Sequence, residues 1–278
     1  MKNTIVVKST GDKEFFDPEK LVSSLKKSGA EPNVINQILQ DIESWLFTGI
    51  STKEIYKKAF SLLKKSKYSS AARYSLKKAI MELGPSGFPF EQFIGALLRY
   101  QGFDVKVGQT VEGQCITHEV DVIATSNNKQ YLVECKFYNT QGKFANVHVP
   151  LYIHSRVNDI IRKRSGLPEF KDLNFYGWIV TNTRFTSDAE AYGKCAGLQL
   201  MSWDFPAGHS LKNMVEKNGF YPITALSSLE KFHKQLLISR EIVLCRQIVE
   251  SPKVLDITGM KPNKIKKVLE EATELCEI

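Results

Sequence analysis

The residues best suited to chemistry lie in two short apolar segments near the middle of the chain. Residues 120–124 read VDVIA and residues 131–137 read YLVECKF, so Asp121, Glu134 and Lys136 interrupt apolar runs. Carboxylate oxygens are the ligands that Mg²⁺ prefers. A lysine beside such a metal can position a water and stabilise developing negative charge. These residue types predict the metal-dependent hydrolysis of a phosphodiester bond.

A polar turn between the two segments predicts how they pair. Asn127 and Asn128 tolerate positive φ and can form a two-residue hairpin turn. In that register Asp121 lies opposite Glu134, and Lys136 shares the face of Glu134. Two facing carboxylates repel each other, and a divalent cation between them would remove that cost.

Composition and charge narrow the class of protein. The 278 residues are 42% hydrophobic and 24% charged, as in a soluble globular protein with room for two or three domains. We see no membrane-spanning run and no signal peptide. Five cysteines without a CxxC pair argue against a disulfide framework and a zinc site, so we expect a cytoplasmic protein.

The net charge of +8 is unevenly distributed along the chain. Residues 1–83 hold 15 basic and 9 acidic residues, residues 84–205 hold 12 of each, and residues 206–278 hold 11 and 9. Basic flanks attract nucleic acid or nucleotide polyphosphates, although a solvated lysine-rich helix face has the same composition.

The order of elements predicts an α/β (α+β) fold in three parts. Residues 1–83 begin with a strand and continue with four helical stretches, the last from Ala71 to Leu83. Asp17 is a good N-cap for the first of these helices, and Ser51-Thr52-Lys53-Glu54 is a capping box that opens the third. The run Gly84-Pro85-Ser86-Gly87 is the clearest linker. Residues 84–205 predict a helix, a three-strand meander and then alternating helices and strands, which implies a mixed sheet. Residues 206–278 are mainly helical.

The central part resembles the PD-(D/E)XK nuclease superfamily, in particular its Mrr-like restriction endonucleases. The residues that carry the resemblance are Gly87-Phe88-Pro89-Phe90-Glu91, Gly102-Phe103, His118-Glu119-Val120-Asp121, Glu134-Cys135-Lys136 and Val180-Thr181-Asn182-Thr183. The resemblance implies double-stranded DNA as substrate, Asp121 and Glu134 as metal ligands, Lys136 as the catalytic lysine and Glu91 as a further acid. Many Mrr-like members have Gln at the position of Glu134.

Some of these residues could instead have purely structural roles. Glu91 could be a first-turn helix acid and Lys136 an edge-strand charge. We interpret His118 as a polar strand-entry residue rather than a ligand. Arg156 and Gln141 could contact phosphate or base, or lie on a solvated surface.

The first part resembles the ATP-cone, a nucleotide-binding regulatory domain. The residues that carry this resemblance are Val6-Val7-Lys8, Gly11, Phe16-Asp17-Pro18-Glu19-Lys20-Leu21, Ile50-Ser51-Thr52-Lys53-Glu54-Ile55 and Tyr74. It implies binding of ATP or dATP, with Lys8 and Lys20 converging on the triphosphate. No GxxxxGK[ST] motif occurs, so ATP hydrolysis is not indicated. The alternative is a small helical domain that binds DNA or packs against the rest.

The last part weakly resembles half of a helix-hairpin-helix element, through Leu255-Asp256-Ile257-Thr258-Gly259-Met260 and the apolar residues that follow. In that element backbone amides contact DNA phosphates. We expect residues 206–278 to add DNA affinity, and their deletion to leave the metal site intact. A plain helical extension is the alternative.

Together these patterns predict a Mg²⁺-dependent DNA endonuclease regulated by ATP or dATP. A catalytically silent, nucleotide-sensing DNA-binding protein is the second interpretation. A transcription regulator or reductase fragment is the third, and the absence of a CxxC zinc ribbon disfavours it. A homodimer would supply the two active sites that cutting both DNA strands requires.

Overall fold

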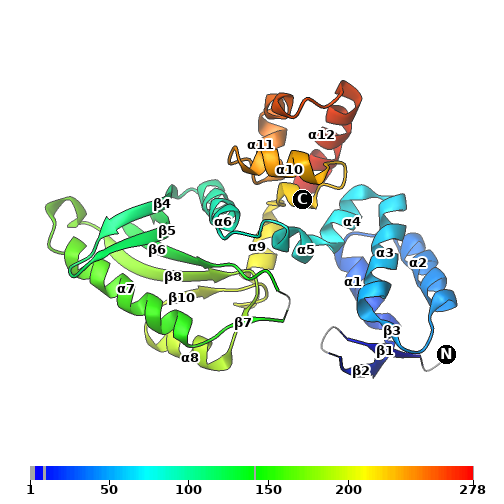
Figure 1. Ribbon diagram of the computed structural model, residues 1–278, viewed down its shortest axis with the longest axis horizontal. Helices are drawn as coiled ribbons and strands as arrows, with labels where there is room; N and C mark the ends of the chain where they lie inside the picture. Colours follow the sequence, from blue (N-terminus) through cyan, green and yellow to red (C-terminus); the bar gives the residue numbers. More distant parts are fainter. Residues whose placement is uncertain (1–3, 9–10, 141, 278) are drawn as a thin grey trace.

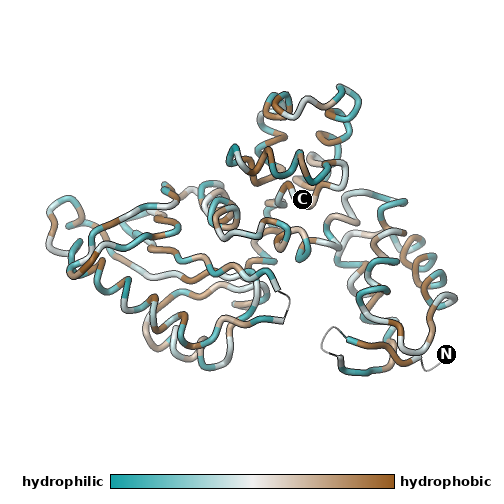
Figure 2. Tube along the Cα trace, in the orientation of Figure 1, coloured by the Kyte–Doolittle hydropathy of each residue, from teal (hydrophilic) through white to brown (hydrophobic). Residues whose placement is uncertain are grey.

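The computed structural model describes residues 4–8, 11–140 and 142–277 (Figure 1). Within these ranges no helix is long and apolar enough to cross a membrane. Figure 2 shows hydrophobic and hydrophilic residues alternating along the helices of the first and last parts of the chain. This alternation is typical of helices that bury one face.

The first part is a helical unit on a small sheet with the strand order β2-β1-β3. Its elements are β1 (Ile5–Val7), β2 (Lys13–Phe15), α1 (Pro18–Lys27), α2 (Pro32–Trp45), β3 (Ile50–Ser51), α3 (Thr52–Ser66), α4 (Tyr68–Tyr74) and α5 (Leu76–Met81). Asp17 caps α1, and Ser51 with Glu54 forms the predicted capping box of α3. An apolar cluster from β1 and α1 to α4 fills the interior of this unit.

The single helix predicted from Ala71 to Leu83 is wrong. The chain bends at Ser75, whose Oγ donates to the backbone oxygen of Ala72 at 3.2 Å. Such side-chain bonds compete with regular helix geometry. The bend also separates two cores, because Ala71 packs with the first part and Leu76 packs with the cluster around α6 (Phe88–Tyr100).

The central part confirms the mixed sheet, in the order β10-β8-β6-β5-β4. Its elements are α6, β4 (Asp104–Glu112), β5 (Thr117–Ser126), β6 (Lys129–Lys136), β7 (Phe144–Ala145), α7 (His148–Arg164), η1 (Pro168–Phe170), β8 (Asn174–Thr181), β9 (Arg184–Phe185), α8 (Ser187–Cys195) and β10 (Gln199–Met201). Strands β4, β5 and β6 form the antiparallel meander, and β6, β8 and β10 are parallel. Helix α6 covers one face, while α7 and α8 cover the other (Figure 1).

The predicted hairpin turn between β5 and β6 is confirmed. Asn127 and Asn128 have φ of 48° and 59°, the positive values that a two-residue turn requires. Ser126 pairs with Lys129, and the ladder continues in the predicted register. Local turn chemistry therefore aligns the two strands that carry the candidate site.

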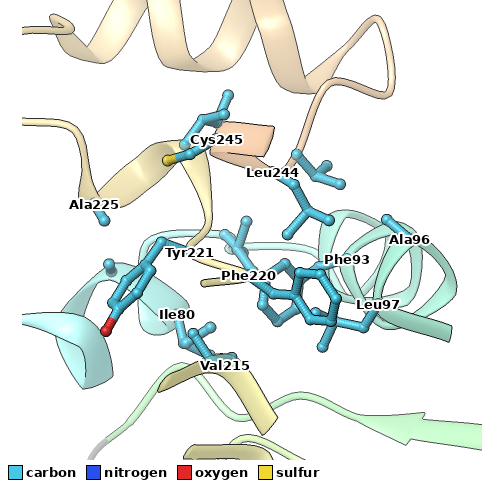
Figure 3. Close-up of a cluster of buried hydrophobic side chains, with 14 of the residues drawn as sticks. Ile80, Phe93, Ala96, Leu97, Val215, Phe220, Tyr221, Ala225, Leu244 and Cys245 are labelled. Atoms are coloured by element: carbon cyan, nitrogen blue, oxygen red, sulfur yellow. The ribbon is translucent and has the colours of Figure 1, made fainter. Parts of the chain in front are cut away.

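The last part of the chain packs into the same core as α6. Its elements are α9 (Leu211–Asn218), η2 (Ile223–Ala225), α10 (Lys231–Ile238), α11 (Cys245–Glu250), η3 (Pro252–Thr258) and α12 (Pro262–Cys276). Figure 3 shows Phe220 and Leu244 beside Phe93 and Leu97 of α6, with Ile80 of α5 close by. Residues from all three parts thus build one apolar cluster on the face of the sheet that α6 covers. We call this cluster the core behind the sheet.

Candidate active site

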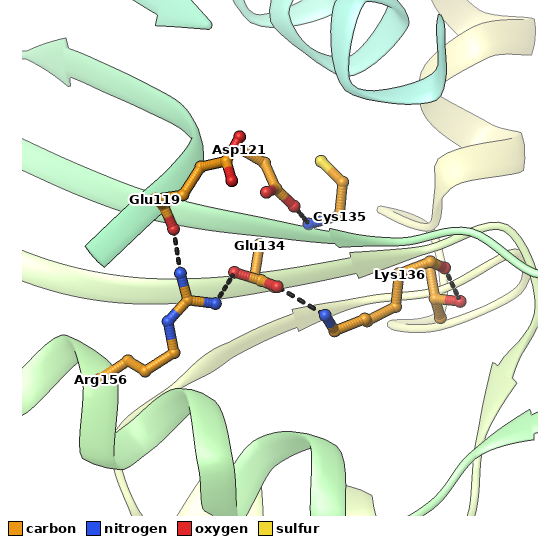
Figure 4. A network of polar contacts seen from close by, with 7 residues as sticks. Glu119, Asp121, Glu134, Cys135, Lys136 and Arg156 are labelled. Atoms are coloured by element: carbon orange, nitrogen blue, oxygen red, sulfur yellow. Dashed lines mark hydrogen bonds and ion pairs between the residues drawn. The ribbon is translucent and has the colours of Figure 1, made fainter. Parts of the chain in front are cut away.

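Strands β5 and β6 stop pairing where the candidate residues lie. Their ladder ends at Val122 and Val133, whereas β6 continues to pair with β8 as far as Lys136. Beyond the ladder the backbone N–H of Cys135 donates to Asp121 Oδ2 at 2.7 Å (Figure 4). The predicted register is confirmed up to this point, but Asp121 contacts β6 through its carboxylate instead of through a ladder pair.

The side-chain alternation of β5 is interrupted at Asp121. Val122 belongs to the apolar cluster on the α6 side, whereas Val120 belongs to the cluster on the α7 side. Residues two apart in a regular strand face the same side. Asp121 therefore lies at an irregularity of the strand that the sequence pattern did not indicate.

Glu134 is a buried carboxylate held between two cations. It is 7% exposed, and its Oε1 lies 2.5 Å from Lys136 Nζ. Its Oε2 lies 2.9 Å from Nη1 of Arg156, which reaches the site from α7 and also donates to the backbone oxygen of Glu119 (Figure 4). The contact with Lys136 confirms that these two residues of β6 share a face. The two cations offset the cost of burying Glu134.

Two neighbouring carboxyl groups have raised pKa values. Burial and the nearby charge of Glu134 raise the pKa of Asp121 to about 6. Burial, together with the charges of Asp121, Glu119 and Glu134, raises the pKa of Glu91 in the first turn of α6 to about 7. The structure therefore brings all four predicted residues into one electrostatic neighbourhood, in which acids outnumber cations.

The donor chemistry of this neighbourhood fits a hard divalent cation. Within the described ranges, no three His, Cys, Asp or Glu side chains are gathered so that they could hold a metal ion on their own. Mg²⁺ usually binds through one or two carboxylates and keeps waters or phosphate oxygens in its other positions. Asp121 and Glu134 can supply those carboxylates, and a divalent charge beside them would relieve the repulsion that raises the pKa of Asp121.

Lys136 is a cation fixed at the end of β6. Burial by itself lowers the pKa of Lys136, but the charge and hydrogen bond of Glu134 raise it above its ordinary value. Thr181 Oγ1 donates to the backbone oxygen of Lys136 at 2.7 Å. The Asn182 side chain bonds both backbone groups of Tyr138, each at 2.9 Å. These contacts give residues 181 and 182 a supporting role that we did not assign from the sequence.

The remaining central residues fall into different environments. His118 is buried, and its Nε2 lies 2.8 Å from Asp159 Oδ2, while the Asp159 carboxylate also accepts from the backbone N–H of Cys115 at 3.0 Å. His118 thus joins β5 to α7, in agreement with a structural interpretation. Arg156, for which the sequence left two roles open, lies in the site, and Gln141 is outside the described residues.

In the first part, Lys8 and Lys20 meet at one acid. Glu14 Oε2 lies 2.7 Å from Lys8 Nζ and 3.6 Å from Lys20 Nζ. Glu14 and Lys20 also line a cavity with Tyr56 and Tyr74, whose rings stack with centroids 5.0 Å apart. Phosphate groups of a nucleotide would compete with Glu14 for the two lysines.

In the last part, Gly259 has φ of 64° and forms the turn between η3 and α12. Three of the nearby lysines contact the protein itself, and one of them is Lys266, whose Nζ lies 3.9 Å from Glu270 Oε1. Lys264 pairs with Glu230, and Lys267 Nζ lies 3.1 Å from the hydroxyl of Tyr68 on α4. The helix-hairpin-helix resemblance stays a prediction.

Family models match three consecutive parts of the chain. An ATP cone domain matches residues 4–81, a restriction endonuclease domain of the Mrr type matches residues 84–205, and a model described as AF1548-like, C-terminal, matches residues 221–276. The resemblances of the first two parts are thereby confirmed.

Comparisons with individual proteins each cover more than half of the chain. An uncharacterized protein of Archaeoglobus fulgidus is 30% identical over 181 residues, which are 64% of this chain and 97% of the relative. The crystal structure of AF1548, a protein of unknown function, is 28% identical with a TM-score of 0.57, covering 69% of this chain and 98% of that one. The structure of Can2 from Sulfobacillus thermosulfidooxidans with cyclic tetra-adenylate is 13% identical with a TM-score of 0.35, a likeness too low to support an argument.

Proposed function

Because the chain belongs to the AF1548-like family and joins an ATP cone domain to an Mrr-type restriction endonuclease domain, we propose that it is a Mg²⁺-dependent DNA endonuclease regulated by ATP or dATP. We assign Asp121 and Glu134 as metal ligands, Lys136 as the catalytic lysine and Glu91 as an accessory acid.

The observation that carries this proposal is the buried Glu134 between Lys136 and Arg156, beside two acids with raised pKa values. A domain that needed only a stable core would gain little from this cluster, since buried charges are costly even when paired. Perturbed pKa values around specific charge partners are common at functional sites.

Each residue has a distinct task in phosphodiester hydrolysis. When bound, the metal ion would polarise the phosphate and acidify a water. Lys136 Nζ lies 2.5 Å from Glu134 Oε1, so it supplies a fixed positive charge that can contact an oxygen of the attacked phosphate. Arg156 has a planar guanidinium that suits a second phosphate oxygen. Glu91 has a pKa of about 7, so it is suited to exchange a proton near neutral pH.

For regulation, we propose that a nucleotide binds beside Lys8 and Lys20 and alters the contacts of the first part with the rest of the chain. The convergence of both lysines on Glu14 supports this position. The Thr224 hydroxyl donates to the Ala79 backbone oxygen at 2.6 Å, which links α5 to the last part of the chain. A nucleotide that shifts α5 would therefore act on the core behind the sheet.

We further propose the division into residues 1–83, 84–205 and 206–278, cytoplasmic activity, and a homodimer for double-strand cleavage. The separate apolar cluster of the first part supports the first boundary. The scattered spacing of the five cysteines, without a CxxC pair, supports a reducing compartment.

Cleavage of supercoiled plasmid tests the proposal. Methylated and unmethylated plasmids are incubated with Mg²⁺ or with EDTA, each with ATP, with dATP and without nucleotide. We expect nicked or linear product only with Mg²⁺, at a rate that depends on nucleotide. If every arm leaves the plasmid intact while nucleotide still changes DNA binding, the chain is a catalytically silent, nucleotide-sensing DNA-binding protein.

A further inference from the structure

Exposed apolar side chains are concentrated in the segment that leads into the helix carrying Arg156. Of the eleven large hydrophobic residues exposed in the described ranges, three lie between positions 144 and 152, namely Phe144, Leu151 and Tyr152. Monomeric surfaces usually scatter such residues singly, and local concentrations mark binding sites. This segment leads from β7 into the first turns of α7, the helix that carries Arg156.

Tyr152 is connected to the active site through Arg156. The two residues are four positions apart, so they are neighbours on α7. The Arg156 guanidinium carbon lies 5.4 Å from the centre of the Tyr152 ring, and Nη1 of the same guanidinium lies 2.9 Å from Glu134 Oε2. Arg156 therefore contacts both the Tyr152 ring and Glu134, which we assign as a metal ligand. The Tyr152 side chain is nevertheless 60% exposed.

Cationic side chains near the ring suit a nucleic-acid strand. Arg156, which is also paired with Glu134, lies against the ring, and Lys143 is exposed in the segment that leads to it. Strands without base pairing are typically held by positive charge along the backbone and by aromatic rings on which bases stack. A paired base in duplex DNA is already stacked on both faces and cannot cover the tyrosine.

We infer that Tyr152 is a stacking platform for an unpaired base next to the scissile phosphate, so that the strand being cut is unpaired there, within a locally opened duplex or in a single strand. The inference rests on the proposed nuclease function and specifies its substrate class. It also gives Tyr152 the role of a specificity-determining residue that touches the substrate.

Binding to labelled oligonucleotides in EDTA tests this inference without cleavage. Fluorescence anisotropy would compare a 20-nucleotide single strand, its matched duplex and a duplex with a four-nucleotide central bubble. Tyr152→Leu removes the aromatic face but keeps an apolar side chain, and Tyr152→Phe keeps the face. Phe232→Leu is the matched control, because Phe232 is 67% exposed on α10.

We expect Tyr152→Leu to weaken binding of the single strand and the bubble by about 5- to 150-fold, the range found for the loss of one stacked base. Tyr152→Phe and Phe232→Leu should stay within about twofold of the wild type on every substrate. The matched duplex should be nearly insensitive to all three changes.

Two outcomes would overturn the inference. One is equal weakening of single strand and duplex by Tyr152→Leu, which would assign the ring to a groove contact. The other is no weakening beyond that of Phe232→Leu. If the wild type bound none of the three oligonucleotides, this would refute both the proposal that DNA is the substrate and the stacking role of Tyr152.

Discussion

Arg73 of α4 donates through Nη2 to the backbone oxygen of Glu274 at 3.0 Å, and to that of Glu277 at 3.1 Å. The carbonyl groups at the end of a helix lack intrahelical partners and attract cations. A residue of the ATP cone domain thus caps α12 at the far end of the sequence. Since α12 contributes Val268 and Leu275 to the core behind the sheet, Arg73 joins the ATP cone domain to the helix that packs against that core.

From this contact we predict that Arg73→Ala separates nucleotide binding from its effect on cleavage. The loss of hydrogen bonds to a charged donor should reduce the free energy of unfolding by about 1–2 kcal/mol. The ratio of cleavage rates with and without saturating ATP should move toward one, whereas ATP binding measured by calorimetry should persist. Lys26→Ala is the control, and an unchanged ratio in Arg73→Ala would contradict the connection.

At the active site we predict opposite effects on stability from two conservative changes that both abolish cleavage. At pH 7 Asp121 is ionised although burial and Glu134 raise its pKa to about 6, so Asp121→Asn should stabilise the metal-free protein by about 1 kcal/mol. Glu134→Gln leaves Lys136 and Arg156 without a countercharge and should destabilise it by about 1–3 kcal/mol.

Urea denaturation in EDTA measures both effects, and plasmid cleavage in Mg²⁺ should fall at least 100-fold in both variants. Lys136→Ala should be equally inactive. An active variant among the three would remove that residue from the catalytic assignment, and equal stability changes would refute the charge distribution described for the site.

For the ATP cone domain we predict that two substitutions shift nucleotide affinity in opposite directions. Lys20→Ala removes a phosphate partner and should weaken binding, whereas Glu14→Gln releases Lys8 and Lys20 and should strengthen it. In the wild type, ATP at 100 times its Kd should stabilise the domain by about 2.7 kcal/mol. The thermal shift at a fixed ATP concentration ranks the variants by their affinity for nucleotide, and Lys26→Ala on the same helix is the control. Weaker binding by Glu14→Gln would place the triphosphate elsewhere.

A pH-dependent contribution to stability is predicted for Asp159. Its hydrogen bond with His118 is the main reason that the pKa of Asp159 is lowered from 3.8 to about 2. An acid with a lowered pKa stabilises the fold above its ordinary pKa, and this contribution is lost as the pH falls toward 2. Asp159→Asn should therefore reduce the urea midpoint most at pH 6–7 and progressively less below about pH 4. Asp172→Asn, a change at an exposed aspartate, should show no such trend; an effect of Asp159→Asn that stays constant with pH would contradict the ionic role.

The last part of the chain cannot be tested by deletion, contrary to the expectation from the sequence. Leu211, Phe220 and Val268 share a buried core with Phe93 of α6, so removing residues 206–278 would expose that core and unfold the nuclease domain. The expectation that the metal site survives the deletion stays a prediction, and the shared core argues against it.

We predict instead that substituting exposed lysines near the Gly259 turn weakens DNA binding. In Lys253→Ala/Lys261→Ala the slope of log K against log salt should become shallower by about 1–2, since each lost phosphate contact contributes about 0.9. The matched control is Lys106→Ala/Lys171→Ala in the central part. Equal slopes in the two double variants would indicate a packing role for the turn.

The sequence predicted features that depend on a few neighbouring residues. The cap at Asp17, the capping box at Ser51 and the turn at Asn127 follow from local side-chain and backbone geometry, and all three are confirmed. The strands β2 and β3, three and two residues long, were not predicted, because they exist only through pairing with β1.

Features of the site that depend on distant contacts could not be predicted. Arg156 reaches Glu134 from a helix 22 positions away, and nothing in the spacing distinguishes it from a solvated helix residue. Where the β5–β6 ladder ends, Asp121 instead accepts a bond from the backbone N–H of Cys135, a contact that no local pattern indicates. The bend at Ser75 likewise reflects two separate cores rather than helix propensity.

The core behind the sheet has a consequence for biosynthesis. Residues as late as Leu275 are fully buried in the cluster that supports α6, so a chain still emerging from the ribosome lacks part of that support. The helix that carries Glu91 therefore reaches its final packing only after Leu275 has joined the cluster. A chain that stops before α12 would therefore leave α6, and with it Glu91, without part of its packing.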